Sequence, residues 1–264
     1  MEKVIVITGG SSGIGLCTAK ALRQQGCRVY ELSRRAQGAD AAIVHIQADV
    51  TDEAQVRAAV EEIVRREGRI DVLINNAGFG ISGAVEFTET AEARHQFEVN
   101  FFGMVNMNRA VLPVMRKQGG GRILNMSSVA APIAIPFQAY YSASKAAVRT
   151  YSLALASEVK PFGIEVCVIM PGDIHTGFTA AREKNPAGDD VYNGRIARSV
   201  AVMEHDEETG MTAEAAGAFL CRRALQTHVG PIYTLGGKYK VFVFLTRLLP
   251  MRLMTYIVGK IYAS

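Results

Sequence analysis

Short apolar runs alternate with longer amphipathic stretches from the N-terminus to about residue 235. Most runs are rich in β-branched residues and continuously apolar, which is typical of strands buried on both faces of a parallel sheet. They predict strands at residues 4–8, 28–32, 43–48, 72–75, 122–126 and 165–170. The amphipathic stretches predict helices at residues 13–25, 52–67, 91–118, 140–160 and 212–226. This alternation predicts an α/β fold, with a doubly wound parallel sheet flanked by helices.

The predicted elements belong to one domain, residues 1–237. Residues 181–210 are charged and contain Gly, Asn and Asp, so we expect a mobile excursion that serves as a substrate loop rather than a domain boundary. The basic, apolar tail at residues 238–264 is not an independent domain.

A glycine-rich turn, GGSSGIG at residues 9–15, lies between the first predicted strand and the first predicted helix. Glycines at this place allow a tight turn and bring backbone N–H groups and a helix N-terminus to a pyrophosphate. The spacing is G-x-x-x-G-x-G rather than the general G-x-G-x-x-G. A tight turn without a ligand is the alternative. Position in the first βα unit favours phosphate binding and a Rossmann-type sheet.

The tip of the second predicted strand indicates which dinucleotide binds. It carries Ser33, Arg34 and Arg35, and no Asp or Glu that would bond the ribose 2′-hydroxyl of NAD. Arginine can hold a 2′-phosphate through charge-assisted bonds, so we expect NADP(H) in preference to NAD(H). Two alternatives stay open. In one the arginines form a solvated loop; in the other the strand ends earlier and Glu31 favours NAD(H).

Tyr141 and Lys145 form the candidate catalytic pair. Four residues apart on a predicted helix, they share one face, where the ammonium is expected to lower the phenol's pKa towards neutrality. The spacing recurs at Tyr256 and Lys260, so context has to decide. Only the first pair follows a strand that ends in hydroxyls, Ser127 and Ser128. We therefore interpret the second pair as ordinary tail residues.

Together these residues resemble the short-chain dehydrogenase/reductase family, from about residue 3 to residue 237. Ser128 stands thirteen residues before Tyr141, which is the family spacing and excludes Ser127. The stretch 76–83 loosely resembles hydroxysteroid and retinol dehydrogenases. The other matching motifs are Thr8 to Gly15, Asp49-Val50, Asn75 to Gly78, Asn100, Lys145, and Pro171-Gly172 with Thr176.

The resemblance implies a role for each catalytic residue. Tyr141 exchanges a proton with the carbonyl or alcohol oxygen, and Ser128 polarises that oxygen. Lys145 binds the nicotinamide ribose and lowers the pKa of Tyr141. Asn100 holds a water in a proton relay that reaches Lys145.

The resemblance also implies cofactor contacts. Asp49 and Val50 meet the adenine, and Ile174 and Thr176 meet the carboxamide. His175, between them, is interpreted as a loop residue rather than a base. The implied cofactor-binding residues are Gly9, Ser11, Ser12, Gly13, Ile14, Gly15, Ser33, Arg34, Arg35, Asp49, Val50, Asn76, Ala77, Gly78, Tyr141, Lys145, Pro171, Gly172, Ile174 and Thr176.

The expected activity is NADP(H)-dependent interconversion of a ketone and a secondary alcohol, on a lipophilic small molecule such as a steroid-, retinoid- or acyl-like compound. The resemblance implies a homo-oligomer, a dimer or tetramer, and we expect no metal. The alternative is a non-catalytic NADP(H)-binding scaffold or sensor, which has no need of Ser128 and Tyr141.

The charge of the chain is concentrated in its tail. The formal net charge is +4, yet residues 238–264 hold five cations and no acid, which leaves 24 cations against 25 acids in residues 1–237. A nucleic-acid-binding domain would need a basic stripe on the body, so we expect no such partner. Apolar blocks interrupted by Arg247, Pro250 and Arg252 predict two short amphipathic helices. Three interpretations compete: a lid or subunit contact, a peripheral membrane contact, and a spanning helix.

Four cysteines, Cys17, Cys27, Cys167 and Cys221, form no C-x-x-C pair, and no signal peptide precedes them. Reduced thiols and a cytoplasmic location, with a membrane-peripheral variant if the tail binds lipid, are therefore expected.

Overall fold

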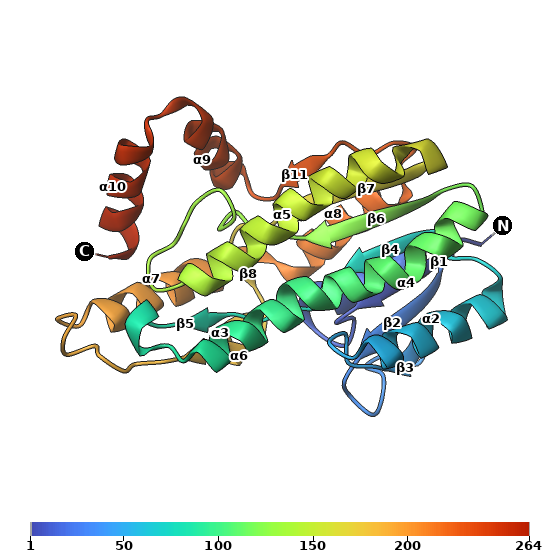
Figure 1. Ribbon diagram of the computed structural model, residues 1–264, viewed down its shortest axis with the longest axis horizontal. Helices are drawn as coiled ribbons and strands as arrows, with labels where there is room; N and C mark the ends of the chain where they lie inside the picture. The colour runs from blue at the N-terminus through green and yellow to red at the C-terminus, as the bar shows by residue number, and fades with distance from the viewer. Residues whose placement is uncertain (1, 264) are drawn as a thin grey trace.

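A seven-stranded parallel sheet forms the centre of the molecule (Figure 1). The computed structural model describes residues 2–263. The strand order is β11-β7-β6-β4-β1-β2-β3, and every neighbouring pair is parallel. The order reverses between β1 and β4, which opens a crevice at the carboxyl edge of the sheet. The strands are β1 (Val4–Thr8), β2 (Arg28–Ser33), β3 (Val44–Gln47), β4 (Val72–Asn75), β6 (Gly121–Met126), β7 (Ile164–Met170) and β11 (Ile232–Thr234).

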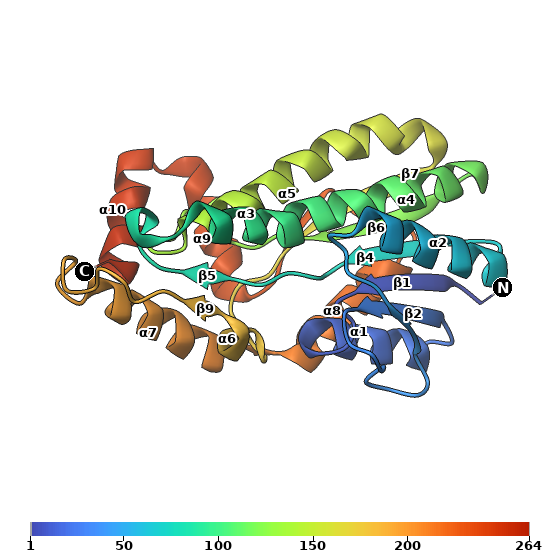
Figure 2. The same cartoon turned by 60° about the horizontal axis from the view of Figure 1, so that its bottom comes forward.

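Helices cover both faces of this sheet, so the predicted Rossmann-type fold is confirmed. Figure 2 shows the sheet edge-on, with α2, α4 and α5 above it and α1 and α8 below. The bounds of these helices are α1 (Gly13–Gln24), α2 (Glu53–Glu67), α4 (Gly103–Lys117), α5 (Ala139–Val159) and α8 (Ala213–Leu225).

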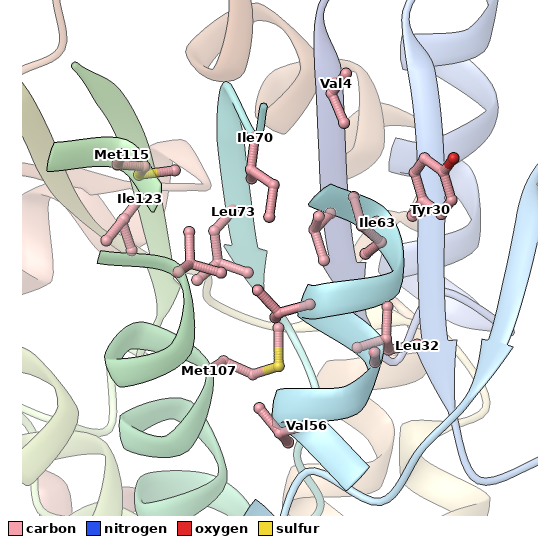
Figure 3. Close-up of a cluster of buried hydrophobic side chains, with 14 of the residues drawn as sticks. Val4, Tyr30, Leu32, Val56, Ile63, Ile70, Leu73, Met107, Met115 and Ile123 are labelled. Atoms are coloured by element: carbon pink, nitrogen blue, oxygen red, sulfur yellow. The ribbon is translucent and has the colours of Figure 1, made fainter. Parts of the chain in front are cut away.

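The core above the sheet shows why these segments take these structures (Figure 3). On α2, Val56 and Ile63 repeat at helical spacing and are fully buried against β2 and β4. Burying each such side chain contributes roughly 1.5–3 kcal/mol. The Asp52 side chain accepts the N–H groups of Ala54 and Gln55 to begin this helix. Gly68, with φ 72°, ends it.

The predicted helix at residues 91–118 is interrupted. It consists of α3 (Thr90–Phe97), a π-helical stretch (Glu98–Phe102) and α4. The Gly103 N–H bonds to the Glu98 carbonyl, five residues back, which is the π-helical pattern. Asn100 lies inside the stretch and is buried. A single wider turn hardly changes the spacing of apolar residues, so the sequence pattern predicted one uninterrupted helix.

The expectation of a mobile excursion at residues 181–210 is wrong for half of the segment, because α7 (Arg195–Glu208) forms there. Ile196, Ser199 and Met203 are buried at helical spacing, and the many charges around them mask the stripe in the sequence. Two short parallel pairings involve the strands that come before and after α7 in the chain. The strand β5 (Ile81–Ser82) pairs with β9 (Glu183–Lys184), and β8 (Ile174–His175) pairs with β10 (Met211–Thr212). The remaining short elements are η1 (Val85–Phe87), η3 (Lys160–Phe162) and α6 (Phe178–Ala181).

The tail forms two short helices on either side of Pro250, as predicted: α9 (Gly237–Leu248) and α10 (Met251–Tyr262). Val243 of α9 and Val258 of α10 are buried in a third apolar cluster beside β7. Figures 1 and 2 both show α10 beside α7, at the opposite end of the molecule from the N-terminus. Among residues 2–263, no helix has the length and apolarity needed to cross a membrane.

Candidate active site

A cleft of about 800 Å³ opens at the carboxyl edge of the sheet, where the strand order reverses. It collects most residues singled out in the sequence, from segments far apart in the chain. Gly15 and Asn100 are not on its wall. The singled-out residues that line it are Gly9, Ser11, Ser12, Gly13, Ile14, Ser33, Arg34, Arg35, Asp49, Val50, Asn76, Ala77, Gly78, Ser128, Tyr141, Lys145, Pro171, Gly172, Ile174 and Thr176.

The glycine turn forms one wall and depends on glycine for physical reasons. Gly9 (φ 65°) and Gly13 (φ 51°) are in the left-handed region that favours glycine. A Cβ on Gly15 would lie 2.3 Å from the Gly9 carbonyl oxygen, so Gly15 serves close packing rather than ligand contact. The Asn76 amide bonds the carbonyl oxygens of Thr8 and Gly9, both at 3.1 Å, and fixes the turn to the segment after β4. No side chain among the described residues caps the N-terminus of α1, so its first N–H groups are available to bind a phosphate.

The structure of β2 shows where Glu31 lies relative to the tip of the strand. This strand continues to Ser33, so Glu31 is not at its tip. The Glu31 side chain is 2% exposed, bonds the His45 ring and lies against Gly10. It does not line the cleft, although its Oε2 has no hydrogen-bond partner among the described residues.

Arg34 and Arg35 are exposed at the adenosine end of the cleft. Arg35 Nη1 donates to the Ser11 carbonyl oxygen at 3.3 Å. Within residues 2–263, neither guanidinium forms an ion pair with a carboxylate. Two unneutralised guanidiniums beside the glycine turn fit a ribose 2′-phosphate, so the residues present suit NADP(H).

Ser128, Tyr141 and Lys145 meet at the other end of the cleft. Lys145 Nζ donates to the Met126 carbonyl oxygen at 3.0 Å and lies 5.7 Å from the centroid of the Tyr141 ring. The Ser127 hydroxyl donates to the Lys145 carbonyl oxygen at 2.7 Å. The Ser128 oxygen accepts the Ala130 N–H, which leaves its own proton for a ligand. Both serines line the cleft, and the Ser127 hydroxyl is already bound to the α5 backbone; the assignment of Ser128 as the functional serine stays a prediction.

The predicted lowering of the Tyr141 pKa is not found. Burial raises this pKa to about 12, and the Ser128 hydroxyl only partly opposes the shift. The phenol is therefore protonated at neutral pH, the state from which a proton can be donated, but the raised pKa makes it a weaker acid than an ordinary tyrosine. Burial also lowers the pKa of Lys145 to about 8. The sequence expectation counted the neighbouring charge and omitted the desolvation of both groups.

Asn100 lies behind the cleft rather than on its wall. Its Oδ1 accepts the Phe79 N–H at 3.0 Å, and its Nδ2 donates to the Phe79 carbonyl oxygen at 2.9 Å and to Ser144 Oγ at 3.2 Å. A Cβ on Gly78 would contact both Asn100 Oδ1 and Lys145 Nζ, at 3.0 and 3.4 Å. Asn100 is thus close to Lys145 and holds the segment after β4 in place.

The substrate end contains four residues that sequence reasoning missed: Asp173, Phe178, Arg182 and Glu207. The Phe178 ring lies 6.0 Å from the Tyr141 ring, and the buried Arg182 pairs with Glu207. Arg182 Nη1 has no hydrogen-bond acceptor among the described residues. Burial and nearby carboxylates raise the pKa of Asp173 to about 6. Only Asp173, which follows the Pro-Gly motif directly, carried a usable signal in the sequence.

Two residues set aside in the sequence lie apart from this chemistry. His175 lies in the short strand β8 rather than in a loop; it is exposed, its Nδ1 contacts the Glu208 carbonyl oxygen at 3.0 Å, and it does not line the cleft. Tyr256, of the second Tyr/Lys pair, is 62% exposed on α10, away from the cleft. All four cysteines are free thiols.

Comparison with known proteins decides the family. A profile described as short chain dehydrogenase matches residues 3–187, more than half of the chain. The chain belongs to the short-chain dehydrogenase/reductase family. It is 43% identical to a 3-ketodihydrosphingosine reductase of Bacteroides thetaiotaomicron, over 99% of this chain and 98% of that protein. This short-chain dehydrogenase/reductase is therefore an oxidoreductase with full-length similarity to a named lipid reductase.

Solved structures agree with this membership. A short-chain dehydrogenase from Streptomyces avermitilis superposes with a TM-score of 0.84 at 31% identity, over 98% of this chain and 96% of that one. The structure titled ElxO with NADP bound superposes with a TM-score of 0.76 at 25% identity, over 91% of this chain and 100% of that one. The fold thus matches proteins of the family along nearly the whole chain.

Proposed function

We propose that this protein is an NADPH-dependent reductase that converts the ketone of a long-chain lipid into a secondary alcohol, with 3-ketodihydrosphingosine as the first candidate substrate. The observation that carries the proposal is the convergence of Ser128, Tyr141 and Lys145 at one end of a cleft whose other end presents Arg34 and Arg35. The full-length similarity to a 3-ketodihydrosphingosine reductase supports this substrate. A non-catalytic NADP(H) sensor would need no such convergence.

In this proposal the cofactor lies along the cleft, from the glycine turn to the candidate catalytic residues. The glycine turn and the N-terminus of α1 bind its pyrophosphate, and Arg34 and Arg35 bind its 2′-phosphate. Asp49 and Val50 lie at the adenine, and Ile174 and Thr176 at the carboxamide. When bound, the nicotinamide supplies the hydride that reduces the carbonyl carbon.

The residues at the reacting end supply the proton. The Ser128 hydroxyl donates a hydrogen bond to the ketone oxygen and polarises the carbonyl. The Tyr141 phenol, which is protonated at neutral pH, transfers its proton to the same oxygen as negative charge develops there. Lys145 binds the ribose and stabilises the phenolate that remains. We expect a water held by Asn100 to return a proton by way of Lys145.

The substrate end matches the polar head of a 3-ketosphingoid base, which carries an amino group beside the ketone, a terminal hydroxyl and a long alkyl chain. Asp173 and Glu207 line this end of the cleft and offer two carboxylates to a substrate ammonium. Arg182 Nη1 offers a donor for the hydroxyl. The rings of Phe79 and Phe178 offer apolar surface for the chain.

The test is a panel of 3-ketodihydrosphingosine, an acyl ketone, a steroid, a retinoid and a sugar, each with NADPH and with NADH. We expect consumption of NADPH with the sphingoid ketone. Tyr141→Phe should bind NADPH, measured by cofactor fluorescence, and lose turnover. Tyr140→Phe is the matched control, because Tyr140 does not line the cleft. Unchanged turnover in Tyr141→Phe would falsify the mechanism, and NADPH binding without consumption on any carbonyl would favour the sensor.

A further inference from the structure

The outer faces of α9 and α10 are apolar and exposed. On α9, Val241, Phe244 and Leu248 are spaced three and four residues apart and are 60%, 56% and 63% exposed. On α10, Met251 and Tyr256 are 71% and 62% exposed. These five large exposed side chains within residues 241–256 are more than scattered single exposures. We call this set of five residues the tail stripe.

Cations flank the tail stripe. Lys240 and Arg247 lie on α9, Arg252 and Lys260 lie on α10, and all four are exposed. Within residues 2–263, Lys240, Arg247 and Arg252 have no carboxylate partner. Residues 238–264 contain no Asp or Glu at all. The tail therefore combines an exposed apolar stripe with unneutralised positive charge.

The inner faces of the two helices already fix the tail to the domain. Val243, Met254 and Val258 are buried, and the Tyr239 ring lies against Gly172. Arg195 of α7 donates to the Ala263 carbonyl oxygen at 2.6 Å. The tail stripe thus remains exposed although both helices are packed. Among the described residues, none that lines the cleft comes from the tail, which meets the cleft wall at Gly172, through Tyr239, and at Asp173, through Lys238.

We propose that the tail stripe docks on a lipid bilayer that contains anionic headgroups. An amphipathic helix with apolar residues on one face and Lys or Arg beside them lies in the plane of a membrane interface, and anionic lipids attract the cations. A second copy of this chain is the less suitable occupant. A two-fold contact pairs the same patch with itself, so it would bring the cations of both copies together.

The docking surface lies beside the entrance for substrate. The helix α10 packs on α7, and α7 carries Glu207 at the substrate end of the cleft. A bilayer under the tail would present a lipid ketone close to that end. This consequence rests on the proposed function, whereas docking itself does not.

The test is co-sedimentation of the full-length protein with vesicles of phosphatidylcholine alone and of phosphatidylcholine with phosphatidylglycerol. We expect the protein to pellet with the anionic vesicles and to be released by high salt. Lys240→Glu, Arg247→Glu and Arg252→Glu should each lower the partition about fivefold or more, since each basic residue near such a surface contributes about that factor. Phe244→Glu should lower it as well. Phe162→Glu, an exposed aromatic on η3 outside the tail, is the matched control and should bind as the parent does.

Two results overturn the proposal. One is that the full-length protein stays in the supernatant with anionic vesicles at low salt. The other is that Phe244→Glu converts an oligomer into a smaller species in light scattering while vesicle binding is unchanged, which would make the stripe a subunit contact. Turnover of the ketone in detergent solution is measured in parallel and should be the same for Phe244→Glu and the parent. If the parent binds anionic vesicles but shows no turnover of the ketone, the proposed function is rejected and the docking proposal still holds.

Discussion

The burial of Glu31 bears on the NAD(H) alternative that the sequence left open. From the sequence, this carboxylate was a candidate ribose ligand near the end of the second strand. In the structure it bonds His45, and the other ring nitrogen of His45 lies 2.9 Å from the Arg35 carbonyl oxygen. The residue that could have favoured NAD(H) thus supports the backbone that carries the two arginines.

The arginines can be tested directly. Arg34→Ala and Arg35→Ala should each raise the KM for NADPH about tenfold, because each removes a charge-assisted contact to the 2′-phosphate, worth roughly 1.5–3 kcal/mol. The KM for NADH should stay within about twofold, since NADH lacks that phosphate. Steady-state kinetics with both cofactors supply the measurement and its internal control. Equal losses with NADPH and NADH would show that the arginines support the loop and do not read the phosphate.

At neutral pH the buried ammonium of Lys145 should lower the free energy of unfolding. Burial lowers its pKa from an ordinary value near 10.5 to about 8, so below pH 8 the folded protein carries a buried ammonium that the unfolded chain exposes to water. Lys145→Met should therefore raise the free energy of unfolding at pH 7, by about 1–3 kcal/mol. The gain should shrink between pH 8 and 10, as the folded parent sheds this proton. Urea denaturation at pH 7 and at pH 10 measures this gain in the free energy of unfolding. A gain that is larger at pH 10 than at pH 7 would contradict the argument.

At the scale of elements, six of the seven strands of the sheet and the five main helices were predictable because apolar periodicity and buried position coincide in them, whereas the half-buried three-residue strand β11 was not predicted. The π-helical stretch around Asn100 was not predictable, since one wider turn leaves the periodicity almost unchanged. The helix α7 was missed because its three buried positions stand among charged residues. The candidate catalytic residues were singled out through their spacing, whereas Phe178, Arg182 and Glu207 come together only through the packing of α6 and α7 against the cleft.

The contact between α9 and the Pro-Gly segment gives a prediction about elements. A Cβ on Gly172 would lie 1.9 Å from the Tyr239 ring, so Gly172→Ala should displace the start of α9 and lower stability by about 1–3 kcal/mol. Tyr239→Ala removes the clashing ring. Gly172→Ala with Tyr239→Ala should then lose less stability than the two single losses added together. Additive thermal-denaturation results would show that Gly172 and Tyr239 do not interact.

At the scale of the whole molecule, the charge asymmetry separates two kinds of surface. The cleft is built from residues of a nearly neutral body, and the five cations of the tail lie on helices that pack beside it. The tail interpretations of the sequence treated residues 238–264 as one feature. In the structure the inner face of the tail is buried against the domain and its outer face is exposed. Removing the inner face should therefore lower stability, whereas substitutions on the outer face should not.

A chain that ends at Gly237 should therefore be destabilised, and not merely released from lipid. It loses the buried side chains of Val243, Met254 and Val258, each worth roughly 1.5–3 kcal/mol, and uncovers Val168 and Met170 of β7. For a chain of this size the thermal midpoint should fall by about 10 °C or more. Phe244→Glu, on the outer face, should shift the midpoint by no more than about 2 °C, because surface substitutions rarely exceed about 0.5 kcal/mol. Equal midpoints for the shortened and full-length chains would mean that the inner face adds nothing to the core, and that the tail is bound only through its contacts elsewhere.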